Sequence, residues 1–207
     1  MAIIVHHLVN SRSQRILWML EELGVDYEVA VYQRDSVTNL APPELSSIHP
    51  LGKSPLIEVD GQLIAESGAI IESLCAGFGG EAWTRSRGDA DYPAYLEFFH
   101  FAEGSAMTPV LMNLYASRLG DAAQPILPRI HQQLQAHNEY MEAALEGTGH
   151  FAGSDWSAAD VMMSFPTEIA VMGAGDKFPR IADFVSRCHA RPAWVRARER
   201  GGPYFTF

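Results

Sequence analysis

The sequence predicts an α/β domain followed by an all-α helical domain, and three observations support this fold class. Near the N-terminus a strand pattern, a helical pattern and a second strand pattern follow one another closely, which indicates a β-α-β unit with parallel strands. Asp60-Gly61 then stands between two short apolar runs and is a strong signal for a two-residue β-hairpin. From Tyr92 onward the apolar residues recur at helical spacing.

Local signals support each element expected before residue 77. Ile16, Leu17 and Leu20 recur at helical spacing. Gly24 follows them as a helix stop, and the pair Pro42-Pro43 suits the start of a short helix. The expected strands are residues 3–7, 27–31, the last part of 51–59, and 62–65. The expected helices are residues 14–23, 41–49 and 66–74, which gives the order strand, helix, strand, helix, strand, strand, helix.

The chain is expected to contain two domains. Residues 78–91 are rich in glycine and charge and show weak periodicity, so we interpret them as a linker between a domain at 1–77 and a helical domain at 92–207. The expected helical segments are 92–119, 126–145, 157–171, 179–189 and 192–200. The first is expected to bend near Gly104 or Pro109, and the third to kink at Pro166.

Composition argues against several classes of function. A net charge of -10 disfavours a nucleic-acid partner, which needs a basic patch. No apolar run approaches the ~20 residues of a membrane span, and the N-terminus lacks the pattern of a signal peptide. We therefore expect no membrane partner and a cytoplasmic location.

The cysteines and histidines do not indicate a metal or a dithiol centre. Cys75 and Cys188 are far apart and form no Cys-x-x-Cys, so we interpret both as buried packing residues. None of the 8 histidines has a ligand-like spacing. His6 and His7 are neighbours on a strand and should point to opposite faces. No metal is expected.

Four local motifs together carry a resemblance to a known family. They are Asn10-Ser11-Arg12-Ser13-Gln14-Arg15 before an apolar helix, His49-Pro50-Leu51-Gly52-Lys53-Ser54-Pro55, Glu66-Ser67-Gly68-Ala69-Ile70-Ile71 and Trp156-Ser157-Ala158-Ala159-Asp160-Val161. In this order and spacing they resemble the glutathione S-transferase superfamily over essentially the whole chain. No tyrosine precedes Tyr27, so the closest likeness is to bacterial and fungal, theta-like members with serine at the first strand–helix turn. The resemblance implies a thioredoxin-like first domain and a homodimer.

The resemblance implies glutathione as co-substrate and assigns its ligands. A cis proline at Pro55 would expose the Ser54 backbone for pairing with the cysteinyl part of the tripeptide as an added strand. Glu66-Ser67 opens a helix, whose N-terminal amides attract a carboxylate, and this is the γ-glutamyl pocket by resemblance. Lys53, one of two lysines in the chain, suits the glycyl carboxylate. His49 is a secondary candidate.

Ser11 is the expected catalytic residue. The thiolate of glutathione is the nucleophile, whereas a free thiol has a pKa of ~8.5. The Ser11 hydroxyl in the loop before the first helix can donate to the sulfur. Ser13 is the rival donor, although it is also the natural N-cap of the helix at Gln14. Arg15 either reinforces the positive field or anchors the loop.

Several residues of the helical part are secondary candidates or have structural roles. An apolar acceptor pocket is expected to draw on Met107, Leu111, Met112 and Tyr115, each of which equally suits the helical core. Glu103 lies on an otherwise apolar helix face. Ser157 and Asp160 fit a capping box, and no histidine is expected to join them as a hydrolase would require. The last residues, 204–207, either cover the cleft or dock on the surface.

The expected function is a glutathione transferase that activates the glutathione thiol for attack on small hydrophobic electrophiles. Two alternatives use the same site: glutathione-dependent reduction of peroxides or disulfides, and a non-catalytic glutathione-binding module. A glutathione-dependent isomerase is disfavoured, because residues 10–15 lack the Ser-Ser-Cys-Ser type of loop that the isomerase subgroup carries.

Overall fold

The computed structural model describes residues 2–205, which form two compact units. The first unit combines residues up to 84 with residues from 188 onward, and the second spans Arg85–Arg187. The elements of the first unit are β1 (Ile3–Leu8), α1 (Gln14–Leu23), β2 (Glu28–Tyr32), α2 (Glu44–Ile48), β3 (Leu56–Val59), β4 (Gln62–Ala65), α3 (Ser67–Gly77), the 3-10 turn η1 (Glu81–Trp83) and α9 (Pro192–Gly201).

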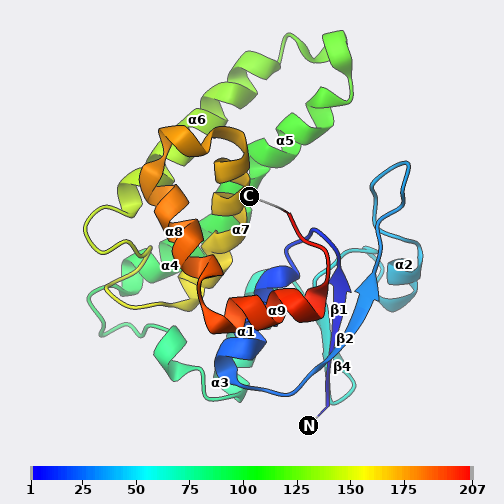
Figure 1. Ribbon diagram of the computed structural model, residues 1–207, viewed down its shortest axis with the longest axis vertical. Coiled ribbons are helices and arrows are strands. Elements are labelled where there is room, and N and C mark those ends of the chain that lie inside the picture. The colour runs from blue at the N-terminus through cyan, green and yellow to red at the C-terminus, as the bar shows by residue number, and fades with distance from the viewer. Residues whose placement is uncertain (1, 206–207) are drawn as a thin grey trace. The chain divides into compact units, whose positions relative to one another are not determined.

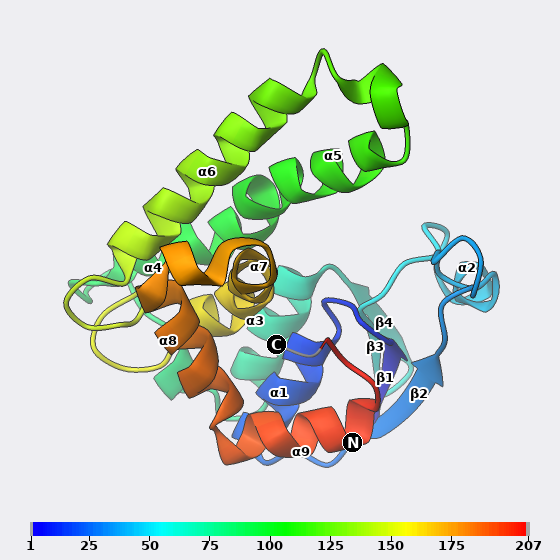
Figure 2. The same cartoon turned by 45° about the horizontal axis from the view of Figure 1, so that its top comes forward.

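The first unit is built on a mixed sheet with strand order β2-β1-β3-β4 (Figure 1). β1 pairs with β2 in parallel, while β3 runs antiparallel to both β1 and β4. The helices α1, α3 and α9 lie on one side of the sheet and α2 on the other (Figure 2). This is the predicted thioredoxin-like arrangement. Asp60 and Gly61 both have positive φ, 49° and 81°, as a tight hairpin between β3 and β4 requires.

Helix α1 forms as its apolar spacing predicts. Ile16, Leu17 and Leu20 are fully buried, and each such side chain contributes about 1.5–3 kcal/mol relative to exposure. Gly24 ends the helix in the left-handed conformation at φ 65°. The amide of Val25 then donates to the carbonyl of Leu20 at 3.1 Å, which closes the last turn.

Helix α9 packs against α1 through ion pairs and close contact (Figure 1). Arg191 binds the carboxylate of Glu22, which also accepts from the Trp18 indole at 2.7 Å. The Arg200 guanidinium lies 3.6 Å from the centre of the Tyr27 ring. Residues from 188 onward therefore belong to the first unit. The domain boundaries predicted at 77 and 92 stay a prediction.

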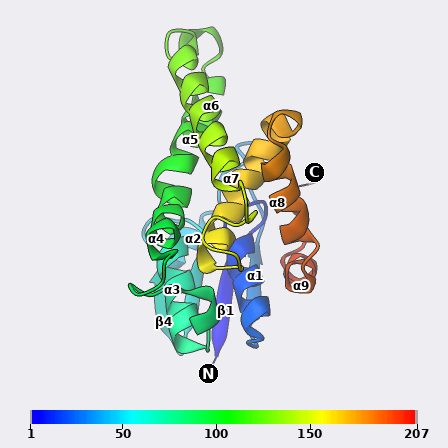
Figure 3. The same cartoon turned by 90° about the vertical axis from the view of Figure 1, so that its left-hand side faces the viewer.

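The second unit is helical. Its elements are α4 (Tyr92–Phe101), the π-helical turn η2 (Ala102–Ala106), α5 (Met107–Ser117), the 3-10 turn η3 (Gly120–Ala123), α6 (Leu127–Ala144), α7 (Ala158–Ala174), the 3-10 turn η4 (Gly175–Lys177) and most of α8 (Pro179–His189). The α5 and α6 helices pack side by side (Figure 3). The π-helical turn contains Gly104, where the sequence predicts a bend, and such turns are a common cause of bending.

The predicted capping box at the start of α7 is confirmed. The Ser157 amide and hydroxyl donate to the Asp160 carboxylate at 2.8 and 2.9 Å, and the Phe151 amide donates to its other oxygen at 2.9 Å. Ser157 and Asp160 are fully buried. Asp160 thus ties the start of α7 to the loop before it, as a folding determinant does.

The two cysteines are buried and form no disulfide, which fits the packing role predicted for them. Burial raises the pKa of the Cys75 thiol to about 12, which leaves it unreactive as a nucleophile. Among residues 2–205 no helix is both long and apolar enough to cross a membrane.

Candidate active site

Three predicted site segments meet at one end of the sheet. Leu56 lies opposite both His6 of β1 and Ala65 of β4 in the strand register. The loop after β1, the segment before β3 and the start of α3 therefore leave the sheet at the same edge. Hydrogen bonds hold the first two together: the Leu8 amide donates to the Ser54 hydroxyl at 3.2 Å, which donates to the His6 carbonyl at 2.8 Å.

The Ser54-Pro55 peptide bond is cis, as predicted. Pro55 is buried at the start of β3, whereas the preceding Lys53 is exposed. The hydroxyl of Ser54 already donates a hydrogen bond to the His6 carbonyl of β1. A peptide ligand would therefore form hydrogen bonds with the Ser54 backbone rather than with its side chain.

Glu66 and Ser67 form the N-terminus of α3. The first helical hydrogen bond runs from the Ile70 amide to the Glu66 carbonyl at 2.9 Å, so the amides of residues 67–69 precede the ladder of the helix and are positioned to bind an anion. Glu66 is exposed and has a φ of 73°. A non-glycine residue in that conformation costs about 1–3 kcal/mol, and such residues cluster at functional sites.

Ser11 lies at the outer end of a buried hydroxyl pair. Its Oγ atom is 2.7 Å from that of Ser13 and accepts the Ser13 amide at 3.2 Å. Ser11 is 6% exposed and Ser13 is 0% exposed. Ser13 occupies the N-cap position of α1 but makes no capping bond with its side chain. Ser13 is thus the N-cap residue, as predicted, but its hydroxyl does not cap the helix, because it turns inward to the Leu8 carbonyl and to His7.

Arg34 fastens the loop that carries Ser11, and sequence reasoning missed it. Its guanidinium donates to the carbonyls of Val9 and Asn10 at 3.0 and 2.9 Å. Burial lowers the pKa of Arg34, and repulsion from Arg12 adds to the shift. Two guanidinium groups therefore lie near the Ser11 loop, where they favour a bound anion. Nothing in the local pattern distinguishes Arg34 from other arginines on the surface.

The two neighbouring histidines of β1 point to opposite faces of the sheet, as alternation predicts. His6 contacts the Tyr32 hydroxyl and the Glu58 carboxylate, both at 3.0 Å. His7 lies on the other face, 1% exposed, with Nδ1 2.8 Å from the Ser13 hydroxyl. Burial lowers the pKa of His7 to about 4, so the ring is neutral at physiological pH.

The residues predicted as secondary candidates for the site differ in their exposure and in their partners. The His49 Nδ1 accepts the Leu51 amide at 3.3 Å, a local bond at the end of α2. Arg15 is 1% exposed, which favours an anchoring role over direct contact with a ligand. Glu103 is partly exposed in the π-helical turn of the second unit. Met107 is 3% exposed and belongs to the core, whereas Tyr115 is 58% exposed.

One histidine lies near the capping box of α7. His150 does approach the Ser157–Asp160 pair, with Nδ1 3.8 Å from the Asp160 carboxylate. The loop before α7 folds back over the capping box, a proximity that sequence spacing does not show. The arrangement is still not a catalytic triad, because Ser157 donates directly to Asp160 and both are fully buried.

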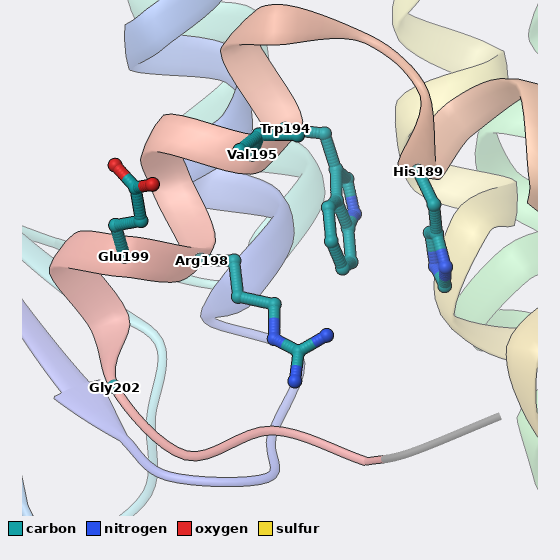
Figure 4. Close-up of a pocket in the computed structure, with 6 residues that line it drawn as sticks. All are labelled: His189, Trp194, Val195, Arg198, Glu199 and Gly202. Atoms are coloured by element: carbon teal, nitrogen blue, oxygen red, sulfur yellow. The ribbon is translucent and has the colours of Figure 1, made fainter.

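A separate pocket of about 590 Å³ lies along α9 (Figure 4). His189 and Trp194 stack there with ring centres 3.9 Å apart. Arg198 extends toward the Trp194 ring, whereas Glu199 points away from it (Figure 4). Val195 and Gly202 complete the lining. None of the predicted glutathione residues lines this pocket.

Known proteins resemble the chain in both sequence and structure. The family described as "Glutathione S-transferase, N-terminal domain" matches residues 1–74. Glutathione S-transferase 3 of Schizosaccharomyces pombe is 36% identical over 178 residues, which cover 79% of this chain and 72% of the relative. Glutathione S-transferase 1 of Saccharomyces cerevisiae is 29% identical over 221 residues, covering 95% and 94%.

A solved structure agrees with these relatives. A glutathione S-transferase from Actinobacillus pleuropneumoniae superposes with a TM-score of 0.87 at 31% identity, covering 96% of this chain and 92% of that one. The chain belongs to the glutathione S-transferase family. The predicted class of enzyme, a glutathione transferase, and the predicted fold class are thereby confirmed.

Proposed function

We propose that the chain activates the thiol of glutathione through the Ser11 hydroxyl and directs the thiolate at small hydrophobic electrophiles. The observation that carries the proposal is the meeting of three segments at one sheet edge: the Ser11 loop, Ser54-Pro55 and Glu66-Ser67. Family membership supports glutathione as co-substrate. A hydrogen bond from Ser11 to the sulfur favours the ionised form and so lowers the pKa of the thiol.

The charged ends of glutathione match the groups at this edge. The γ-glutamyl carboxylate fits the amides that begin α3, with the Ser67 hydroxyl as a further donor. The exposed Glu66 carboxylate pairs with the ligand's amine, and the exposed Lys53 with its glycyl carboxylate. The Ser54 backbone pairs with the cysteinyl residue, which brings the sulfur toward Ser11.

Glu66→Ala and Ser67→Ala are each expected to weaken glutathione binding about 10-fold or more, since each removes a group that pairs with a charged end of the ligand. Stability should change little. Isothermal titration calorimetry measures the affinity, and thermal unfolding measures the stability. Glu72→Ala and Ser73→Ala are matched controls, because both residues are exposed farther along α3. Unchanged affinity in both site variants would remove the γ-glutamyl pocket from the proposal.

A screen of aryl halides, peroxides and disulfides, each with glutathione, identifies the class of electrophile. We expect conjugation of aryl halides to be the fastest reaction. Turnover of peroxides or disulfides without conjugation would replace the transferase reaction with reduction at the same site. Retention on immobilised glutathione without turnover of any of these substrates would indicate a binding module.

We also infer a homodimer, which rests on family membership and on partly exposed polar residues, Glu103 and Ser105, in the π-helical turn. Sedimentation velocity at micromolar concentration should give the mass of two chains. Detection of monomer alone at that concentration contradicts the inference. A cytoplasmic location rests on the sequence and stays a prediction.

A further inference from the structure

A chain of hydrogen-bonding groups leads from Ser11 into the interior of the first unit. Ser11 Oγ lies 2.7 Å from Ser13 Oγ, which lies 2.8 Å from Nδ1 of His7. Exposure falls from 6% at Ser11 to 0% at Ser13 and 1% at His7. His7 is thus a buried titratable group two hydrogen bonds from the proposed catalytic hydroxyl, and the proposed reaction does not yet use it.

Ser13 has one hydroxyl hydrogen for three neighbours. Besides Ser11 and His7, the Leu8 carbonyl lies 3.2 Å from its Oγ atom. A serine hydroxyl donates once and accepts through two lone pairs. The direction of each bond in the chain therefore depends on which neighbour receives that hydrogen.

Donation from Ser11 to a sulfur settles the direction of the other bonds. Once the Ser11 hydrogen points at the sulfur, the 2.7 Å contact between the two hydroxyl oxygens needs the hydrogen of Ser13, since two lone pairs at that distance repel. Ser13 then has no hydrogen left for the His7 ring. At 2.8 Å, Nδ1 of His7 must in turn be the donor.

The Nε2 side of the ring lies against Gly201 at the end of α9. Among the described residues Nε2 of His7 makes no hydrogen bond of standard geometry, although the Gly201 backbone acts on the ring as a hydrogen-bond acceptor. The hydrogen on Nδ1 therefore follows from the contact with Ser13 and not from the surroundings of Nε2. The Gly201 backbone faces Nε2: a Cβ atom on Gly201 would lie 3.1 Å from Nε2 and 2.8 Å from Leu17 Cδ1. Glycine at the end of α9 lets the helix close over the imidazole, so His7 is shielded from substrate.

We propose that His7 is a positioning residue for Ser11: it donates its Nδ1 hydrogen to Ser13, directs the Ser13 hydrogen to Ser11, and leaves the Ser11 hydrogen for the glutathione sulfur. The inference rests on the proposed role of Ser11. His7 does not touch glutathione or the electrophile.

A role as the base that accepts the thiol proton is a poorer fit. Burial lowers the pKa of His7 to about 4, although a hydrogen bond with the Gly201 backbone opposes the shift. A free thiol has a pKa of about 8.5, so transfer of its proton to this ring is strongly uphill. A neutral imidazole that holds one hydrogen in a fixed direction meets no such barrier.

The test compares His7→Leu with His7→Asn in the full-length protein. Leucine removes the donor, whereas the asparagine amide places an N–H close to the position of Nδ1. Thiolate absorbance reports the pKa of bound glutathione, and kinetics with an aryl halide separate kcat from KM. We expect His7→Leu to raise the thiol pKa by about half to one unit and to lower kcat about three- to tenfold, the size of one lost hydrogen bond. KM for glutathione should stay unchanged and His7→Asn should recover most of the loss.

Ser13→Ala tests the same chain without altering the ring and decides the matter if His7→Leu does not fold. It should shift the thiol pKa and kcat in the same direction as His7→Leu. In a Ser11→Ala background, neither change should have a further effect on the thiol pKa, because coupled residues are not additive.

The thiol pKa values of these variants distinguish the role of His7 from that of Ser11. A wild-type thiol pKa in Ser13→Ala and in folded His7→Leu, alongside a raised pKa in Ser11→Ala, overturns the role of His7 alone. His7→Asn behaving like His7→Leu also overturns the donor role. An unchanged thiol pKa in Ser11→Ala overturns the proposed role of Ser11 itself.

Discussion

The Ser11→Ala variant is expected to conjugate a reactive aryl halide about 10- to 100-fold more slowly than wild type, the effect of one hydrogen bond to a developing or full negative charge. Glutathione should still bind, because the α3 amides and the Ser54 backbone are untouched. Steady-state kinetics at saturating glutathione, together with calorimetric binding, separate the two effects.

Two further variants control this result. Ser11→Thr keeps a hydroxyl at the same place and should retain much of the activity. Ser186→Ala removes an exposed serine of α8 and should behave as wild type. Wild-type turnover in Ser11→Ala would assign the sulfur to Ser13 or to the backbone amides at the start of α1.

The Asp160→Ala variant is expected to lose about 2–4 kcal/mol of unfolding free energy. It removes a capping box, whose loss costs about 0.5–2 kcal/mol, and it leaves the buried amides of Phe151 and Ser157 without their acceptor, at about 1–3 kcal/mol each before relaxation. Burial raises the pKa of Asp160 to about 6, while the hydrogen bonds from Phe151 and Ser157 oppose that shift. The carboxylate is therefore ionised at neutral pH. Urea unfolding at pH 7 measures the loss.

Asp155→Ala is the matched control for Asp160→Ala. Asp155 is exposed, and its carboxylate accepts a 3.3 Å bond from the Ser154 hydroxyl, so its removal should change stability by no more than about 0.5 kcal/mol. The folded fraction of Asp160→Ala should bind glutathione with wild-type affinity. A stable Asp160→Ala protein that no longer binds glutathione would contradict the structural assignment.

Local elements were predictable because their signals lie within a few residues of each other. The α1 helix runs over the expected residues, since its apolar face and the left-handed Gly24 are both encoded in that segment. The hairpin at Asp60-Gly61 and the capping box at Ser157 have the same local origin. The second strand begins one residue later than expected, at Glu28, and the Tyr27 carbonyl that precedes it accepts a hydrogen bond from Arg200 of α9.

Contacts between distant segments were not predictable from spacing. Glu22 and Arg191 are far apart in sequence, and their ion pair exists because α9 docks on α1. The approach of His150 to Asp160 depends likewise on how a loop folds back. Such contacts follow from tertiary packing, which leaves no periodic trace in a single sequence.

The residues of the candidate site likewise fall into those that local motifs predicted and those that depend on distant partners. The Ser11 loop, Ser54-Pro55 and Glu66-Ser67 were found through motifs, and the strand register brings them to one edge. Arg34 and His7 were missed as site residues because their roles depend on partners from other elements. Strand alternation does place His7 on the face of the sheet opposite His6. Because Ser13 directly precedes the helix that starts at Gln14, this alternation is the one sequence signal for the contact between His7 and Ser13.

The most direct test of the central claim is the pKa of the glutathione thiol in the binary complex, measured by ultraviolet difference titration of wild type and Ser11→Ala. Wild type should hold the thiol pKa well below the ~8.5 of a free thiol. Ser11→Ala should raise it by about one to two units, as the loss of a hydrogen bond to a charged atom predicts. An identical thiol pKa in the two proteins would contradict the claim that the Ser11 hydroxyl activates glutathione.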